Sequence, residues 1–354
     1  MSAETETKQW ILTNKPVMDP VFSGANPTFT LQTTKLSAPK PDEVLVKALH
    51  LSNDPAQRAW IQRDADPARM YTAPVPVGVP MRAMGICEVV TAGSDSKFQA
   101  GQLVFGSPGW SQYAVLPAAE CRPIDTSAGI SPTYYIGVFG GPGTTAWYGL
   151  IDIARTSKDD GLVVISGAAG ATGSIAVQIA KHVVGVKKVV GIAGSEEKCR
   201  WVESIGADVC INYKTANFTQ ELKNATEGFA DVYFDNVGGE ILDLMLTRMK
   251  KFGRVTACGA IANYNKLGDP TGVKHWSEII MNRIEVKGFV VLDAYATGRA
   301  GEIRNELVKA YKEGKVKIDA ASETVVETKF EDIPKTWMML FEGGNQGKLV
   351  TKLV

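Results

Sequence analysis

The sequence predicts an α/β fold in which a doubly wound parallel sheet is combined with a separate, irregular β domain. Up to about residue 130 the chain consists of short β-like segments divided by proline and glycine, whereas after Trp147 apolar runs alternate with helical patterns. The chain has 354 residues, which is more than one hydrophobic core usually organises. We therefore expect two domains.

The irregular β domain is predicted from both ends of the chain. Strand-like runs occur early, at Glu43–Leu51, Ile86–Ala92 and Leu103–Ser107. After Ala320 the chain returns to strand-like pieces, at Thr324–Glu327 and Lys348–Leu353. We therefore expect a discontinuous domain formed by residues 1–135 and 320–354, with residues 136–319 forming the second domain between them.

The parallel sheet of the second domain is predicted from six apolar runs that have helix-like segments between most of them. These runs are Leu162–Ser166, Lys188–Ile192, Asp208–Asn212, Asp231–Asp235, Gly253–Ala257 and Val286–Val291. Their spacing is typical of a doubly wound sheet with helices on its faces.

The charge balance excludes one class of partner. The chain has 38 basic and 38 acidic residues, so its formal net charge is zero. Nucleic-acid-binding proteins normally carry a basic excess or a basic stripe, because neutralising phosphate supplies most of their affinity. We therefore expect no nucleic-acid partner.

The cysteines and the first residues indicate a cytoplasmic protein. The five cysteines stand far apart without a C-x-x-C pair, which argues against a disulfide framework or a structural zinc site. Residues Met1–Gln9 lack the basic and apolar stretches of a signal peptide. The low-charge run Leu162–Ala180 is interrupted by three glycines, so we expect no membrane partner.

The segment Leu162–Lys181 (LVVISGAAGATGSIAVQIAK) predicts a dinucleotide site. A buried-type strand ends at Ser166, and Gly167, Gly170 and Gly173 follow before an apolar helix. Glycines permit a tight turn and a close approach of backbone to pyrophosphate, and the helix N-terminus supplies free N–H groups. The alternative, a buried glycine-rich helix cap, does not explain the β/α units that follow. The sheet is therefore expected to be of the Rossmann type.

The end of the next strand favours NADP over NAD. An NAD enzyme normally offers an acidic residue to the ribose hydroxyls about 20 residues after the glycines. This chain has Ala193-Gly194-Ser195 there, followed by two glutamates and Lys198. A small neutral turn with Ser195 and Lys198 suits a 2′-phosphate. The alternative is that Lys198 is only an exposed residue in the first turn of a helix, where glutamates are also common.

The histidines predict chemistry without a metal. Zinc enzymes need three or four ligands together, but His50, His182 and His275 are scattered among other residue types. Without zinc, a substrate carbonyl has to be polarised by hydrogen bonds, for which tyrosine hydroxyls are suitable. The Y-x-x-x-K pattern at Tyr311–Lys315 lies late, at a predicted helix end, and we assign it no role.

Ten short motifs resemble, in order, one family over nearly the whole chain. They are Asn53–Pro55 with Arg58, Met84–Gly85, Gly140–Gly149, Ala168–Ser174, Gly194–Lys198, Asn212–Lys214, Phe234–Gly239, Cys258–Asn265, Gly288–Val291 and Asn345–Lys348. The chain resembles the zinc-independent double-bond reductases of the medium-chain dehydrogenase/reductase superfamily, which include prostaglandin reductases, leukotriene hydroxydehydrogenases, plant alkenal reductases and bacterial curcumin reductase. The resemblance implies that the irregular β domain is GroES-like.

The resemblance also implies a set of NADPH-binding residues. Gly170, Ala171, Thr172 and Gly173 would hold the pyrophosphate, and Lys198 and Tyr213, next to Ser195, would contact the 2′-phosphate. The remaining members of the set are Asn53, Asn236, Cys258, Gly259, Ala260, Ile261, Tyr264, Phe289, Val290, Val291 and Asn345.

The reaction implied by the resemblance is hydride transfer from NADPH to the β-carbon of an α,β-unsaturated aldehyde or ketone. Tyr264 and the nicotinamide ribose hydroxyl would stabilise the enolate before the α-carbon is protonated. Tyr71 is the second catalytic candidate. The family often has tyrosine and then methionine after N-D-P, whereas this chain has Ala56-Gln57, which leaves the width of the substrate pocket open.

Two other functions are weighed against this one. A quinone or carbonyl reductase would keep the same cofactor, and a non-catalytic NADPH-binding protein is a third possibility, because the superfamily also resembles lens crystallins and vesicle-associated proteins. The glycine turn, Lys198, Tyr213 and Tyr264 are all present, which favours an enzyme. The resemblance further implies a homodimer through the sheet edge near Val286–Leu292.

Overall fold

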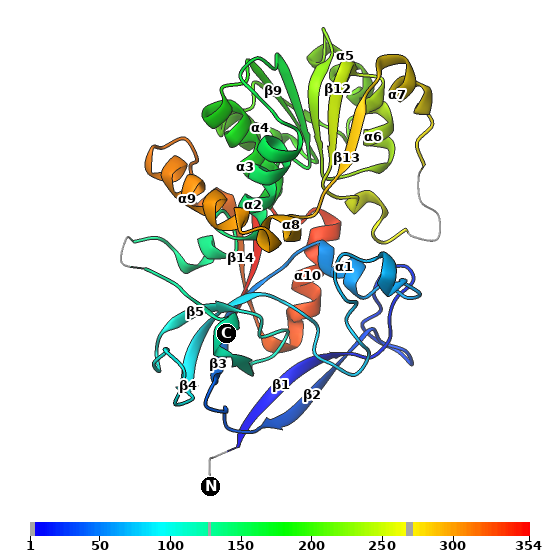
Figure 1. The fold of residues 1–354 in the computed structure, drawn as a ribbon. Helices are drawn as coiled ribbons and strands as arrows, with labels where there is room; N and C mark the ends of the chain where they lie inside the picture. The colour runs from blue at the N-terminus through cyan, green and yellow to red at the C-terminus, as the bar shows by residue number, and fades with distance from the viewer. Residues whose placement is uncertain (1–3, 127–128, 267–271) are drawn as a thin grey trace. The chain divides into compact units, whose positions relative to one another are not determined.

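The computed structural model describes residues 4–126, 129–266 and 272–354. The chain forms two compact units (Figure 1). The first consists of Met1–Ile136, Val325–Gly344 and Leu349–Val354, and the second of Gly137–Thr324 and Asn345–Lys348. A parallel sheet with helices in one unit and a β-rich second unit confirm the predicted fold class.

The second unit contains a six-stranded sheet whose strands all run parallel. The strand order is β10-β9-β8-β11-β12-β13, so the order reverses between β8 and β11. The strands are β8 (Leu162–Ser166), β9 (Lys188–Ala193), β10 (Val209–Asn212), β11 (Ala230–Asp235), β12 (Met249–Ala257) and β13 (Glu285–Gly288). This is the predicted doubly wound arrangement, and ligands of such sheets bind where the order reverses.

One predicted strand is partly wrong. The run Val286–Val291 was expected to be a single strand, but β13 ends at Gly288 and helix α8 (Val291–Ala296) begins at Val291. The reason lies in the neighbouring strand, because Gly288 pairs with Ala257, the last residue of β12. Residues beyond Gly288 therefore have no further strand to pair with on that side.

Helices cover both faces of this sheet. Figure 1 shows α3 (Ala171–Gln178) and α4 (Glu196–Ser204) on one face, and α6 (Gly239–Leu246) and α7 (Trp276–Asn282) on the other. Connections between parallel strands cross over in a right-handed sense. Because the strand order reverses within the sheet, these connections place helices on one face before the reversal and on the other face after it. The remaining helices of the unit are α2 (Gly141–Trp147), α5 (Phe218–Ala225), α8 and α9 (Arg299–Lys312).

The core of the second unit is built by the near-continuous apolar strands. Val164, Val190 and Val255 are fully or almost fully buried, and Tyr233 is buried with them. Parallel strands covered on both faces have this uniform apolar character. The expected helix end near Tyr311 is also present, because α9 ends at Lys312 and Gly314 takes a positive φ of 70°.

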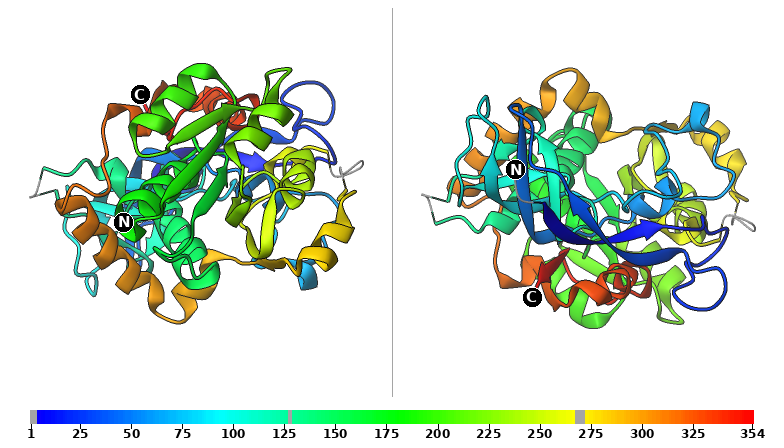
Figure 2. Two further views of the ribbon diagram at one scale, coloured as in Figure 1. Left: turned by 90° about the horizontal axis from the view of Figure 1, so that it is seen from above. Right: turned by 90° about the horizontal axis from the view of Figure 1, so that it is seen from below.

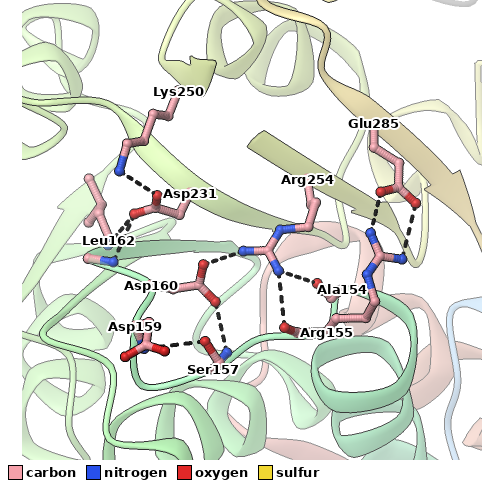
Figure 3. A network of polar contacts seen from close by, with 11 residues as sticks. Ala154, Arg155, Ser157, Asp159, Asp160, Leu162, Asp231, Lys250, Arg254 and Glu285 are labelled. Carbon is pink, nitrogen blue, oxygen red and sulfur yellow. Dashed lines mark hydrogen bonds and ion pairs between the residues drawn. The ribbon is translucent and has the colours of Figure 1, made fainter. Parts of the chain in front are cut away.

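A charged network lies at the amino ends of these strands (Figure 3). The Asp231 carboxylate accepts hydrogen bonds from the backbone N–H of Leu162 at 3.0 Å and from Lys250 at 2.8 Å. Arg254 pairs with Asp160 and donates to the carbonyl of Ala154 at 2.8 Å. The network ties the amino edge of the sheet together, whereas ligands of such sheets bind at the opposite, carboxyl edge.

The first unit is built on a seven-stranded sheet. The path is β14-β15-β3-β4-β5-β7, with β6 paired to β3. Its strands are β3 (Glu43–Ser52), β4 (Gly85–Ala92), β5 (Leu103–Gly106), β6 (Tyr113–Pro117), β7 (Arg122–Pro123), β14 (Glu323–Thr328) and β15 (Lys348–Leu353). The last strand of the chain thus joins an early one, since Val350 pairs with Ser52.

Several elements of the first unit were not predicted. β1 (Thr5–Leu12) and β2 (Phe29–Leu36) form an antiparallel ribbon, seen in blue in Figure 2. Most residues of β2 are at least partly exposed, so its sequence shows little apolar patterning. Helix α1 (Ala56–Trp60) is short, and α10 (Ile333–Glu342) packs Trp337 into the core.

None of the described helices could span a membrane. Across the described ranges, no helix combines the length and the apolar character needed to cross a bilayer.

Candidate cofactor-binding site

The glycine turn lies at the carboxyl end of β8. Gly167 has a positive φ of 58°, and a Cβ added to Gly173 would lie 2.2 Å from the Gly167 carbonyl oxygen. Only glycine therefore fits at Gly173 without moving backbone. Gly170 is the N-cap of α3 and provides no side-chain hydrogen bond to its first turn, which contains Ala171, Thr172 and Gly173. The amides of such a first turn, together with the positive end of the helix dipole, are suited to binding an anion.

A buried carboxylate shapes the neighbouring turn after β11. Asp235 is 1% exposed and accepts hydrogen bonds from Ser166 Oγ at 2.9 Å and Tyr233 Oη at 2.8 Å. Burial, followed by the nearby Asp235 charge, raises the pKa of Tyr233 well above its usual value, so Tyr233 stays a donor. Asn236 Nδ2 donates to the Ser166 carbonyl at 2.7 Å. These bonds hold Asn236 beside Gly167, where the strand order reverses.

The segment Cys258–Tyr264 folds against the same turn. The backbone N–H groups of Cys258 and Gly259 donate to the Asp235 carbonyl at 2.8 and 3.1 Å. A short 3₁₀ turn, Ile261–Asn263, then leads to Tyr264, whose hydroxyl accepts a hydrogen bond from the Ala260 N–H at 3.3 Å. The predicted residues from 258 to 264 are thus brought to the edge where Asn236 lies.

The loop before β15 reaches the glycine turn. Asn345 Nδ2 donates to the Gly347 carbonyl at 2.9 Å, and the Gly347 N–H donates to the Ala169 carbonyl at 2.8 Å. Gly347 also forms an isolated parallel bridge with Gly170. A segment far away in sequence therefore brings Asn345 next to the predicted pyrophosphate position.

The carboxyl end of β9 carries a second group of predicted residues. Ser195 is the N-cap of α4, with its Oγ accepting a hydrogen bond from the Lys198 N–H at 3.2 Å. A Cβ added to Gly194 would lie 3.1 Å from the Tyr213 ring, so the absence of a side chain lets this ring lie close. Ser195, Lys198 and Tyr213 are thus clustered.

Lys214 is a member of this cluster that the sequence did not identify. Its Nζ lies 5.9 Å from the centroid of the Tyr213 ring. Burial, and secondly the charge of Lys214, lower the pKa of Lys198. Two ammonium groups that repel each other favour a bound anion between them. Lys214 belongs to the motif Asn212–Lys214, but the sequence assigned it no role.

One of the two glutamates in the first turn of α4 is held by a partner on β10. Glu196 accepts a hydrogen bond from Asn212 Nδ2 at 2.9 Å. Acidic residues in a first turn are ordinary partners of the helix dipole. Glu196 therefore has both a hydrogen-bond donor and the ordinary setting of a first-turn acid in this structure.

The segment Phe289–Val291 passes over the end of β12. The Phe289 N–H donates to the Ala257 carbonyl at 3.4 Å, and its ring packs on Phe234 and Tyr148 with centroids 6.2 and 5.9 Å away. Val290 is the N-cap of α8. These contacts fix the segment through packing of the Phe289 ring.

Two predicted site residues belong to the first unit. Asn53 is 1% exposed, and its side chain donates to Thr351 Oγ1 at 3.0 Å. Tyr71 is 47% exposed, and its hydroxyl accepts a hydrogen bond from Trp60 Nε1 at 2.9 Å. The other predicted site residues all belong to the second unit. Trp60 had not been identified from the sequence, where nothing marks it as a partner of Tyr71.

Comparisons with known proteins establish the family. Residues 171–309 match the family described as zinc-binding dehydrogenase, and residues 8–124 match the family described as N-terminal domain of oxidoreductase. Prostaglandin reductase 1 of Bos taurus is 35% identical over 351 residues, which cover 98% of each chain. The chain belongs to the zinc-independent medium-chain dehydrogenase/reductase family.

Two further members of this family resemble the chain over almost its whole length. The NADP⁺-dependent 2-alkenal reductase of Nicotiana tabacum is 34% identical, covering 99% of this chain and 98% of that protein. The crystal structure of CurA in complex with NADPH, from Vibrio vulnificus, is 31% identical with a TM-score of 0.85. The similarity covers 98% of this chain and 99% of that one.

The three histidines lie in three different environments. His50 lies in β3, where burial and, secondly, Lys352 lower its pKa. The His182 ring bonds to the Ile205 carbonyl at 3.1 Å, and His275 pairs with Asp243 at 2.9 Å. Among the residues that the structure describes, no three His, Cys, Asp or Glu side chains are grouped as metal ligands.

Proposed function

We propose that this enzyme uses NADPH to reduce the carbon–carbon double bond of α,β-unsaturated aldehydes or ketones. The chain is an NADP-dependent oxidoreductase, and two of its relatives are named as NADP-dependent enzymes. The observation that carries the proposal is the cluster of Ser195, Lys198 and Tyr213, where an NAD enzyme would have an acid. Substrate class is inferred from relatives named as alkenal and prostaglandin reductases.

The residues at the carboxyl edge of the sheet fit a dinucleotide. The first-turn amides of α3 bind the pyrophosphate, which the closely packed Gly173 permits, and Lys198 with Tyr213 binds the 2′-phosphate. Asn236, the segment Cys258–Tyr264, Phe289–Val291 and Asn345 line the remaining cofactor surface. When bound, NADPH supplies the hydride.

In the reaction, side chains of the protein stabilise the negative charge that develops on the substrate. Addition of hydride to the β-carbon moves negative charge to the carbonyl oxygen, and hydrogen-bond donors aimed at that oxygen lower the barrier. Tyr264 lies on the segment that folds against the Asn236 turn and serves as one donor. The α-carbon then takes a proton, which completes the reduction.

Activity toward three classes of substrate distinguishes the proposed function from a quinone reductase and from a non-catalytic binding protein. NADPH consumption is measured with a simple alkenal, an open-chain enone and a quinone, with products identified by mass and a chelator-treated control. A saturated carbonyl product that is unaffected by chelator supports the proposal. Turnover of the quinone alone would favour a quinone reductase, and NADPH binding without any turnover would favour a binding protein.

A homodimer through β13 is the second part of the proposal. All four residues of β13 are exposed, and the strand is at the edge of the sheet. Neighbouring apolar side chains are also exposed, with Trp276 at 62%, Ile280 at 66% and Met281 at 69%. An unpaired edge with apolar neighbours suits pairing with the same edge of a second copy.

A further inference from the structure

We propose that Cys199 and Cys210 are a redox-sensitive thiol pair, which hydrogen peroxide closes to a disulfide beside the corner assigned to the 2′-phosphate. Formation of the disulfide depends on the two thiols alone, whereas its effect on NADPH binding rests on the proposed function. Both cysteines belong to the second unit, and both are free thiols in this structure.

Two neighbouring elements bring these thiols together. Cys199 lies in α4 and Cys210 in β10, the outermost strand of the sheet. Cys210 pairs with Gly191 of β9, and a Cβ added to Gly191 would lie 3.1 Å from Cys210 Sγ and 2.7 Å from Val202 Cγ1. The Cys210 thiol therefore lies in the space that the missing side chain leaves, on the face covered by α4.

The two side chains interact across this space. Cys199 and Val202 are three residues apart in α4 and both buried, so they share the face that packs on the sheet. The Cys210 thiol donates a hydrogen bond to the Cys199 sulfur. The Cys210 N–H donates to Glu203 Oε1 at 2.9 Å, which ties β10 to α4 at the same place. The two sulfurs thus face each other, as closure to a disulfide requires.

The environment assigns different roles to the two thiols. The hydrogen bond from Cys210 is the largest cause that lowers the pKa of Cys199, and it outweighs burial and the charges of Glu196 and Glu203. The same hydrogen bond, followed by burial, raises the pKa of Cys210. Cys199 therefore has more of the thiolate, which is the form that attacks an oxidant.

Access to the pair limits the size of the oxidant. Cys199 is 4% exposed, whereas Cys210 is partly exposed at the edge of the sheet. A small uncharged molecule such as hydrogen peroxide suits this opening better than a bulky disulfide.

The reaction balances with one molecule of hydrogen peroxide. The Cys199 thiolate attacks one peroxide oxygen, the O–O bond breaks, and the released hydroxide takes up the proton that Cys199 had lost. The Cys210 sulfur then attacks the sulfenic acid on Cys199, so that the S–S bond forms and the S–O bond breaks. The second hydroxide leaves as water with the Cys210 proton. The two thiols together lose two electrons, which reduce the peroxide to two waters.

The position of the disulfide links it to the cofactor corner. Lys198 directly precedes Cys199, and Tyr213 follows Cys210 by three positions. An S–S bond is about 2.05 Å long, which is shorter than any non-bonded approach of two sulfurs. Closure therefore draws the first turn of α4 toward β10 and changes the spacing of Lys198 and Tyr213.

The first test maps the disulfide in the full-length protein. The reduced protein is treated with hydrogen peroxide and then unfolded, its remaining thiols are alkylated, and its peptides are analysed by mass spectrometry. The expected result is a linked pair of peptides containing Cys199 and Cys210, with a loss of two hydrogen atoms from the intact mass. Dithiothreitol should reverse this change.

A matched control is present in the same chain. Cys87 and Cys121 belong to one buried cluster of the first unit, but burial is the main cause that raises the pKa of both thiols. Neither thiol supplies a thiolate, so this pair should stay reduced under the same treatment.

The second test measures cofactor binding in the two redox states. Closure of the disulfide is expected to weaken NADPH binding about fivefold or more, which is the lower end of ordinary coupling between two sites, and to leave NADH binding unchanged. Cys199→Ser lacks the attacking thiolate, so peroxide should not change its NADPH affinity. In Cys210→Ser the oxidation should stop at a sulfenic acid on Cys199, which dimedone traps.

Three results would overturn the inference. These are the absence of a linked Cys199–Cys210 peptide pair, equal oxidation of Cys87 with Cys121, and equal NADPH affinity of the reduced and oxidised protein. If the variants do not fold, reversal in the parent decides, because a loss of NADPH affinity that dithiothreitol does not restore would come from other residues. Failure of the reduced protein to bind NADPH would instead refute the proposed function, and the peptide map would still test the disulfide.

Discussion

The Ser195 hydroxyl accepts a hydrogen bond from the backbone N–H of Lys198 across 3.2 Å, at the first turn of α4. The serine cap starts this helix directly at the end of β9 and so determines where the Lys198 side chain leaves the backbone. Tyr213 and Lys214, after β10, complete the same corner. The proposed preference for NADPH therefore rests on a corner that begins with a local helix-capping motif.

Lys198→Ala is expected to weaken NADPH binding by about tenfold or more, because a charge-assisted hydrogen bond contributes about 1.5–3 kcal/mol. The affinity for NADH, which lacks the 2′-phosphate, should change little. Dissociation constants for both nucleotides from fluorescence titration measure the difference. Lys223→Ala, an exposed lysine of α5, is the control. Equal losses for NADPH and NADH would contradict the assigned role.

The pH dependence of binding should follow Lys198. Burial lowers the pKa of this lysine, and Lys214 lowers it further. Its charge in the free enzyme is therefore present at neutral pH and lost at a lower alkaline pH than for an ordinary lysine. NADPH affinity should fall as the pH rises from 7 toward 10, while NADH affinity stays flatter. An NADPH profile that is identical in Lys198→Ala would exclude Lys198 as the titrating group.

Gly173→Ala is expected to disrupt the glycine turn. The added Cβ would lie 2.2 Å from the Gly167 carbonyl oxygen and 2.8 Å from the Ala168 Cα, both of them backbone atoms. The unfolding free energy should fall by about 1–3 kcal/mol and NADPH affinity at least tenfold. Urea titration and fluorescence binding measure the two effects.

Gly301→Ala provides the control for this substitution. Gly301 lies inside α9, and a Cβ added there would meet no atom within 4 Å. Alanine should be neutral or stabilise the helix by about 0.5–1 kcal/mol. A destabilisation of Gly301→Ala as large as that of Gly173→Ala would contradict the close-approach argument.

Val286→Lys is expected to convert a homodimer to a monomer, because a lysine on an exposed edge strand opposes strand pairing. Val286 is 46% exposed in β13. Light scattering after gel filtration measures the mass. Val90→Lys, at a 39% exposed valine in β4 within the other sheet, should leave the mass unchanged. A monomeric parent protein would exclude the dimer.

The sequence predicted the parts of the fold that repeat a simple pattern. Apolar runs such as Leu162–Ser166 match β8 at both ends, because buried parallel strands carry an unbroken apolar signal. The end of β13 was missed because it is determined by the end of β12, a neighbour in space. The ribbon of β1 and β2 was missed because its sequence is largely polar and exposed.

The candidate site was predictable only where local sequence carries the chemistry. The glycine turn and the Ser195–Lys198 corner are contained in short motifs. The Asp235 network and the contact of Trp60 with Tyr71 depend on side chains that folding brings together. The roles of all these residues in binding and catalysis stay predictions.

The most direct test of the central claim follows the transferred hydride. NADPH carrying deuterium at the transferring position of its nicotinamide is incubated with an open-chain enone, and the product is analysed by NMR and mass spectrometry. Deuterium on the β-carbon of a saturated ketone is the predicted result. Deuterium on the carbonyl carbon of an allylic alcohol would contradict reduction of the carbon–carbon double bond.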